Sequence, residues 1–204
     1  MERFERLTGI AAALPAANID TDIIFPARFL LITEKKGLGA YAFYEWRTLA
    51  GGEPDPAFVL NQCRFRDASI LVTGDNFGCG SSREQACWAL RDAGIRVVIA
   101  TSFGEIFHAN CFKNGMLPVT VSTADLALLM VDAKAGLSFT VDLSAGVLTS
   151  PNGPPIRFET EGWRREALLN GWDEIDIINN SSAAAIDAYE GRGRAATPWL
   201  YQGD

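Results

Sequence analysis

Hydrophobic and polar residues follow the clearest pattern in the centre of the chain. The apolar runs 68–73 and 96–101 predict two buried strands. Between them, residues 82–93 have helical spacing and end at Gly94. Because parallel strands need a crossover connection, the segment predicts a βαβ unit with a right-handed crossover.

Further elements are predicted on the C-terminal side of this unit. They are a short helix near 103–110, a strand near 118–122, a capped helix over 123–136, a hairpin of 138–143 and 147–150 around Ser144-Ala145-Gly146, a helix over 161–171 and a last short helix over 183–190. A parallel unit combined with a hairpin predicts an α/β fold with a mixed sheet.

Glycine and proline mark the predicted loops. Residues 18–21 predict a turn, Pro26 a break, and 51–56 an exposed loop. We expect a single domain over 1–204, with an ordered core at about 4–190 and a loosely ordered tail at 191–204.

Composition narrows the class of protein. The chain has 204 residues, 48% of them hydrophobic, and a net charge of −7. An acidic chain without a Lys/Arg cluster is not expected to bind nucleic acid. The apolar runs fall far short of the roughly 20 residues that span a bilayer, and Pro15 interrupts the N-terminal apolar run, so no signal peptide is predicted. We therefore expect a cytoplasmic protein without membrane association.

Cysteine and histidine are few. The four cysteines contain no C-x-x-C pair, which argues against a structural zinc site or a self-contained iron–sulfur cluster and favours reduced thiols. The one histidine, His108, lies in a semi-apolar segment and is expected to be structural. We expect no metal ligand in this chain.

The densest candidate for chemistry is the glycine-rich stretch 74–84, GDNFGCGSSRE. No lysine follows its glycines, which excludes a Walker loop. Arg83 stands where a dinucleotide-binding loop has its third glycine, which argues against such a loop. The residues after Ser81 and Ser82 do not fit the G-x-S-x-G pattern of a nucleophile elbow.

Two interpretations of the stretch remain. In one, Ser81 and Glu84 form a capping box that starts the helix. In the other, free N–H groups at the helix start and the planar guanidinium of Arg83 bind a carboxylate. The glycines exceed what a cap requires, which indicates that the backbone approaches something closely.

The residues of this stretch also resemble a known family. NFGCGSSRE resembles the signature loop of the aconitase swivelling domain, in particular that of the small subunits of 3-isopropylmalate dehydratase. NIDTDIIFPARFL, GLGAYAFYEWR and NGWDEI resemble other segments of this family in the same order, so the resemblance covers nearly the whole chain. It implies a three-layer β/β/α swivelling domain.

The resemblance also implies a function. Such proteins are lyases of leucine and branched-chain amino-acid biosynthesis that convert 2-isopropylmalate to 3-isopropylmalate via 2-isopropylmaleate. The chain would act only with a large subunit, as a heterodimer or higher assembly, and that subunit would carry the [4Fe–4S] cluster. A small dicarboxylate or hydroxy acid would be the substrate.

Site roles follow from the resemblance as well. Ser81 would be the catalytic base, and Arg83 would bind a substrate carboxylate. The other residues implied to bind substrate are Gly80, Ser82, Asp20, Thr21, Asp22, Arg28, Leu30, Leu31 and Ile32, with Leu38 as a further apolar candidate. The alternative for Asp20, Thr21 and Asp22 is an N-cap or Asx turn. The region 28–56 would be a mobile substrate loop.

Two positions depart from the family pattern. Gln85 stands where a histidine is usual, and Cys87 stands where a small residue or proline is common. Related hydratases of dimethylmaleate, citraconate or homoaconitate therefore remain alternatives, as does a non-catalytic anion-binding module.

Overall fold

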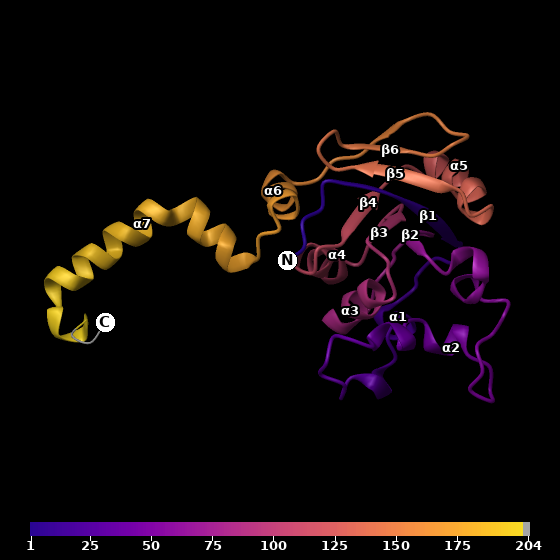
Figure 1. Cartoon of the computed structure of the whole chain (residues 1–204), viewed down its shortest axis with the longest axis horizontal. Coiled ribbons are helices and arrows are strands. Elements are labelled where there is room, and N and C mark those ends of the chain that lie inside the picture. Colours follow the sequence, from indigo (N-terminus) through magenta and orange to yellow (C-terminus); the bar gives the residue numbers. More distant parts are fainter. Residues whose placement is uncertain (202–204) are drawn as a thin grey trace. The chain divides into compact units, whose positions relative to one another are not determined.

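The computed structural model of the chain describes residues 1–201 and divides into two compact units, Met1–Gly171 and Trp172–Asp204. The first unit contains a seven-stranded mixed sheet with the strand order β4-β3-β2-β1-β5-β6-β7 (Figure 1). Its strands are β1 (Arg6–Leu14), β2 (Ala68–Thr73), β3 (Val97–Ala100), β4 (Leu117–Thr120), β5 (Ser138–Asp142), β6 (Val147–Thr149) and β7 (Ile156–Arg157).

Six α-helices are described in the first unit and one in the second. The helices are α1 (Thr21–Ile24), α2 (Tyr44–Arg47), α3 (Glu84–Asp92), α4 (Glu105–Lys113), α5 (Thr123–Lys134), α6 (Gly162–Asn170) and α7 (Glu174–Ala196). The strand–helix–strand unit predicted in the centre is confirmed: β2 and β3 pair in parallel, and α3 connects them. The predicted hairpin is confirmed as the antiparallel pair β5–β6.

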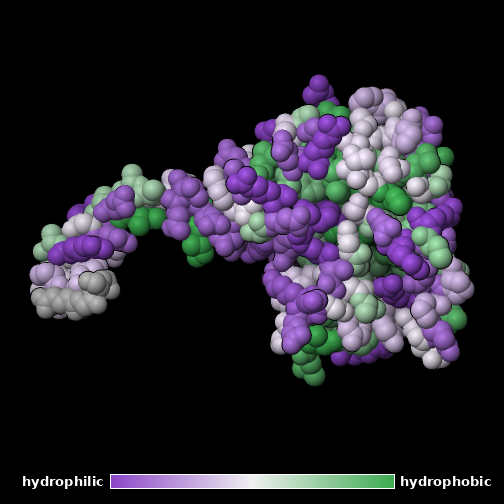
Figure 2. Space-filling view, in the orientation of Figure 1, coloured by the Kyte–Doolittle hydropathy of each residue, from purple (hydrophilic) through white to green (hydrophobic). Residues whose placement is uncertain are grey.

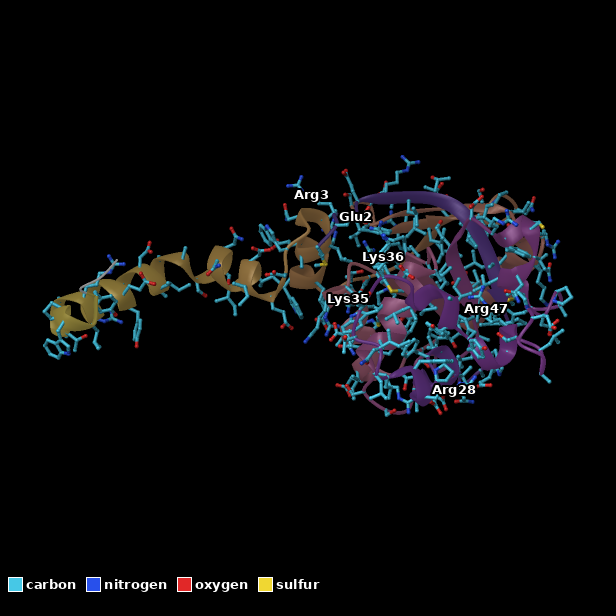
Figure 3. All side chains as sticks on the ribbon, turned by 60° about the horizontal axis from the view of Figure 1, so that its bottom comes forward. Glu2, Arg3, Arg28, Lys35, Lys36 and Arg47 are labelled. Carbon is cyan, nitrogen blue, oxygen red and sulfur yellow. The ribbon has the colours of Figure 1, made fainter. Side chains whose placement is uncertain are left out.

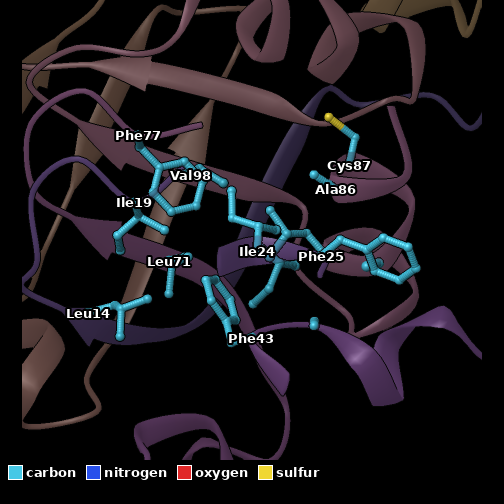
Figure 4. Close-up of a cluster of buried hydrophobic side chains, with 14 of the residues drawn as sticks. Leu14, Ile19, Ile24, Phe25, Phe43, Leu71, Phe77, Ala86, Cys87 and Val98 are labelled. Atoms are coloured by element: carbon cyan, nitrogen blue, oxygen red, sulfur yellow. The ribbon is translucent and has the colours of Figure 1, made fainter. Parts of the chain in front are cut away.

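Both faces of the parallel half of the sheet are buried, and strand periodicity explains how. On β3, Val98 and Ala100 belong to one core cluster, while Val97 and Ile99 belong to the other. The first cluster includes buried residues of α1, α3 and α4, and Figure 4 shows its packing around Phe25, Phe43 and Phe77. The second includes the apolar face of α5. Coverage of both faces explains why β2 and β3 are continuous apolar runs, whereas β5 alternates buried residues with exposed or half-buried ones.

The central strand β1 was not predicted from the sequence. It pairs in parallel with β2 and antiparallel with β5, so it joins the parallel and antiparallel halves of the sheet. Its sequence, RLTGIAAAL, is rich in alanine and glycine, which have weak strand propensity. A Cβ on Gly9 would lie 1.9 Å from Ser69 Oγ, so close packing explains the small residue there.

The region 28–66 is built from short helical turns. They are Ala27–Phe29, Leu38–Tyr41, α2, Val59–Asn61 and Cys63–Phe65. Arg47 connects several of them: its Nη1 donates to the Gly39 carbonyl at 2.9 Å, and its Nη2 donates to Asn61 Oδ1 at 3.1 Å. Burial lowers the pKa of Arg47 by removing water from the guanidinium. Whether part of this region is mobile stays a prediction.

The second unit is dominated by one long helix. A short helix was predicted over 183–190, but α7 extends over 23 residues and continues through Gly191 and Gly193. Helix α7 thus includes 191–196 of the expected tail, whose loose order stays a prediction, and 202–204 lie outside the described residues. Asp173 and Asp176 form a capping box at its start. Figure 2 shows hydrophobic patches on α7 among hydrophilic ones, and the exposed large hydrophobic side chains of this helix include Ile175 and Ile178.

Candidate active site

The glycine-rich loop follows β2 and is held on both sides by neighbouring backbone. On one side, Gly78 N donates to the Ile19 carbonyl at 2.7 Å, and Thr21 N donates to the Cys79 carbonyl at 2.9 Å. On the other side, Gly104 N donates to the Phe77 carbonyl at 2.8 Å. The loop is thus fixed between the segments 16–21 and 102–104 and is not a free surface loop.

Two glycines of the loop serve different purposes. Gly78 and Gly80 both have positive φ, 73° and 90°. A Cβ on Gly78 would lie 2.2 Å from Phe107 Cγ, whereas a Cβ on Gly80 would meet nothing closer than Asp20 Cβ at 3.4 Å. The close approach predicted from the glycine excess is therefore, at Gly78, an approach to the protein's own core.

The predicted capping box at Ser81 is wrong. Helix α3 begins at Glu84, its N-cap is Arg83, and no side chain caps it. The carbonyl of Ser81 instead accepts a hydrogen bond from Thr21 Oγ1 at 2.8 Å, which holds Ser81 outside the helix. Glu84 does not reach back to the loop, since its Oε1 accepts from Asn114 Nδ2 at 2.9 Å.

Thr21 and Asp22 bring the two distant motifs together. Thr21 is buried and lies with its Oγ1 3.5 Å from Ser81 Oγ. Because the single hydroxyl proton of Thr21 is donated to the Ser81 carbonyl, Thr21 can act toward Ser81 Oγ only as an acceptor. Asp22 forms an ion pair with Arg83. The structure thus places Thr21, Asp22, Ser81 and Arg83 in one cluster.

Arg83 is largely covered, with 17% of its side chain exposed, whereas Asp22 is 55% exposed. The hydrogen bond from Arg83 and the backbone N–H of Ala27 hold the pKa of Asp22 below its usual value. Asp22 is therefore charged at neutral pH and fixes the direction of the guanidinium. Gly80, Ser81 and Ser82 are exposed beside it.

Asp20 is an N-cap, which is the structural alternative that the sequence offered for Asp20, Thr21 and Asp22. Its Oδ1 accepts from Asp22 N at 2.9 Å and from Ile23 N at 2.7 Å, which makes it the N-cap of α1. By capping α1, Asp20 fixes the first turn of the helix, in which Thr21 and Asp22 lie.

The residues expected to contact the substrate's side chain lie apart from these contacts. Arg28 pairs with Glu45 at 2.8 Å and stacks on Phe29 and Tyr44. Leu31 is 93% exposed. Leu30 and Ile32 are half-buried against the core, and Leu38 is fully buried, so Leu38 is a core residue in this structure.

Sequence reasoning missed the polar residues that shape the loop's first half. Asn18 and Asn76 both have φ of 56°, and Asn76 Nδ2 donates to Asn18 Oδ1 at 2.8 Å. Asp75 Oδ1 accepts from Thr101 Oγ1 at 2.9 Å and from Ser102 Oγ at 2.6 Å. The signal was present, because asparagine is the non-glycine residue that best tolerates positive φ.

The remaining candidate residues are buried in the supporting structure. Gln85 is half-buried in the first turn of α3. Cys87 and Cys111 are buried with their sulfur atoms 3.9 Å apart, and burial raises the pKa of Cys111. His108 Nδ1 lies 3.2 Å from Arg164 Nη1, and its pKa is lowered by burial and by that positive charge. His108 therefore has structural contacts.

Two general features concern residues 1–201. No group of three or more His, Cys, Asp or Glu residues within this range could hold a metal ion. No helix within it is long and apolar enough to cross a bilayer.

Comparison with known proteins identifies the family. Residues 1–124 match the aconitase C-terminal domain. The small subunits of 3-isopropylmalate dehydratase from Sinorhizobium fredii and Rhodospirillum centenum are 51% and 52% identical to this chain; each alignment covers 98% of the chain and 100% and 98% of those proteins.

A solved structure agrees with the sequence comparisons. The crystal structure of 3-isopropylmalate dehydratase from Methanocaldococcus jannaschii matches with a TM-score of 0.66 at 28% identity, covering 90% of this chain and 99% of that one. The mixed α/β fold expected from the resemblance is thus confirmed. The chain belongs to the family of 3-isopropylmalate dehydratase small subunits, which contains the aconitase C-terminal domain.

Proposed function

We propose that this chain is the small subunit of a hydro-lyase that isomerises 2-isopropylmalate to 3-isopropylmalate via 2-isopropylmaleate, in leucine biosynthesis. The observation that carries the proposal is a sequence identity of 51% and 52%, over nearly the full length, to two small subunits of 3-isopropylmalate dehydratase. The clustering of Ser81 and Arg83 by Thr21 and Asp22 supports it.

In this proposal, the chain moves the proton. Ser81 Oγ as an alkoxide takes the carbon-bound proton during dehydration and becomes a hydroxyl. It then returns a proton to carbon when water adds in the other orientation, so the proton count balances over the isomerisation. Because Thr21 cannot donate to Ser81 Oγ, stabilisation of the alkoxide falls to Arg83 and to loop N–H groups.

Arg83 would bind a substrate carboxylate through its planar guanidinium. Within residues 1–201, Asp22 and the Phe25 carbonyl both accept from Nη1 of Arg83, so Nε and Nη2 of the guanidinium are left for the substrate carboxylate. Ser82 and the Gly80 backbone, both exposed, would complete the carboxylate contacts.

The [4Fe–4S] cluster and the remaining residues of the active site would belong to a large subunit. The side chains of residues 1–201 do not form a cluster-binding set, which fits a [4Fe–4S] cluster held by the partner. When bound there, the cluster would supply a Lewis acid for the substrate's hydroxyl and carboxylate. Asp20, Arg28, Leu30, Leu31 and Ile32 stay proposed substrate-site residues whose roles depend on that assembly.

The test is turnover by the assembled enzyme. The chain and a large subunit would be purified together and given 2-isopropylmalate, with formation of 3-isopropylmalate measured. We expect Ser81→Ala to lower turnover by at least a thousandfold while co-purification persists, because Ser81 is exposed and caps no helix. Ser82→Ala is the matched control and is expected to retain more activity.

Near-wild-type turnover by Ser81→Ala would refute the assigned role of Ser81. Failure to use 2-isopropylmalate while hydrating citraconate or dimethylmaleate would refute the substrate assignment and leave the reaction class intact.

A further inference from the structure

A cavity of about 550 Å³ lies away from the Ser81 cluster, and its charge differs from that of the chain as a whole. Five cationic side chains line it: Lys35, Lys36, Arg91, Arg96 and Lys113. Two acidic side chains, Glu2 and Asp92, line it as well, so the cationic side chains outnumber the acidic ones. In a chain with a net charge of −7, this is a local reversal of sign.

A carboxylate already occupies part of this cavity. Arg91 Nη2 lies 2.6 Å from one oxygen of Glu2, and Arg96 Nη1 lies 2.8 Å from the other. These contacts hold the pKa of Glu2 below its usual value. The two guanidinium groups are therefore arranged to grip one oxyanion between them.

Two lysines extend the positive charge beyond Glu2. Lys35 Nζ lies 4.4 Å from the centre of the Trp88 ring, and Lys36 is exposed. Among the described residues, neither lysine has a carboxylate partner. Figure 3 shows both lysines near Glu2 on the same side of the first unit.

We propose that this cavity binds a small polyanion with two or more carboxylate or phosphate groups. One group would share or replace the Glu2 position between Arg91 and Arg96, and another would meet Lys35 and Lys36. A single charged group would satisfy only one end of this arrangement.

Occupancy would link two parts of the molecule. Lys35 and Lys36 precede the turn Leu38–Tyr41, and Gly39 N of this turn donates to Asp92 Oδ2 at 2.7 Å. Arg91 and Asp92 end α3, the helix whose N-cap is Arg83. A bound polyanion would thus add a further connection between the loop before residue 38 and α3, besides the contact of Lys35 with Trp88.

Binding is tested directly, without turnover, so the result does not depend on the proposed function. Isothermal titration of the full chain would use two probes, tricarballylate for carboxylates and inorganic pyrophosphate for phosphates. We expect saturable binding of at least one probe, weakened roughly tenfold in the double variant Lys35→Gln/Lys36→Gln. Glu2→Gln should bind more tightly, because an internal competitor is removed.

Two control variants separate this site from other sources of charge. Lys134→Gln and Arg157→Gln each remove one exposed positive charge outside the cavity, on α5 and on β7; both should bind as the wild type does. Absence of saturable binding for both probes would overturn the proposal. So would loss of binding in either control equal to the loss in the lysine variant, or a weaker affinity in Glu2→Gln.

Discussion

Replacing Gly78 or Gly80 by alanine separates two reasons for glycine in the same loop. Both residues have positive φ, so each alanine variant bears a backbone strain of about 1–2 kcal/mol. Only at Gly78 does the new Cβ also collide with the Cβ and Cγ of Phe107, 2.6 and 2.2 Å away. Overpacking of a core adds about 1–3 kcal/mol. We therefore expect losses of about 2–5 kcal/mol for Gly78→Ala and about 1–2 kcal/mol for Gly80→Ala.

The assay is urea unfolding of the full chain followed by circular dichroism, with turnover of the assembled enzyme measured in parallel. In a Phe107→Ala background the contact with Cγ is gone while the contact with Cβ at 2.6 Å stays, so Gly78→Ala should cost less than in the wild type but more than the strain alone. Gly80 is exposed beside Ser81, and its replacement should lower turnover more than its stability loss accounts for. An equal loss of stability for the two variants, or no rescue by Phe107→Ala, would refute this reasoning.

Three further predictions concern charge and thiols. Asp22→Asn should lower kcat/KM about tenfold to a hundredfold, because Arg83 loses the carboxylate that directs it, whereas Glu190→Gln, which removes a similarly exposed partner of Arg194, serves as control. Lowering the pH from 7 to 5 should reduce the free energy of unfolding of the wild type. The unfolded chain takes up a proton at His108 near its usual pKa, whereas the folded chain, in which the pKa of His108 is lowered, does not. Urea titrations at each pH measure this dependence, and His108→Asn should reduce it. Iodoacetamide should label the exposed Cys63 rapidly and the buried Cys87 and Cys111 only after denaturation, as mass spectrometry would measure; fast labelling of Cys111 in the folded chain would contradict its burial.

Sequence patterns predicted the elements whose side chains carry a strong period. The bounds of β2 were predicted residue for residue, and the helix predicted to end at Gly171 ends there, with a left-handed cap. Strand β1 was not predicted because alanine has a weak strand propensity. Its alanines form a strand because they pack closely between β2 and β5, and local sequence does not show such long-range packing.

The site shows the same division. Ser81 and Arg83 could be singled out from their loop, and the resemblance added Thr21 and Asp22. The capping box failed because a local pattern, S-x-x-E, competes here with a bond from Thr21, sixty residues away in the chain. Leu38 failed as a contact candidate because apolar character alone does not distinguish a core residue from the wall of a site.

The position of β1 in the sheet has a consequence for synthesis of the chain. β1 is made first, yet its antiparallel partner lies far downstream, with Thr8 and Thr140 separated by 132 positions. At about 5–20 residues per second, the ribosome needs roughly 7–26 s to produce that partner. During this interval the edge of β1 that later pairs with β5 has unpaired backbone N–H and C=O groups, which are a template for pairing with another chain.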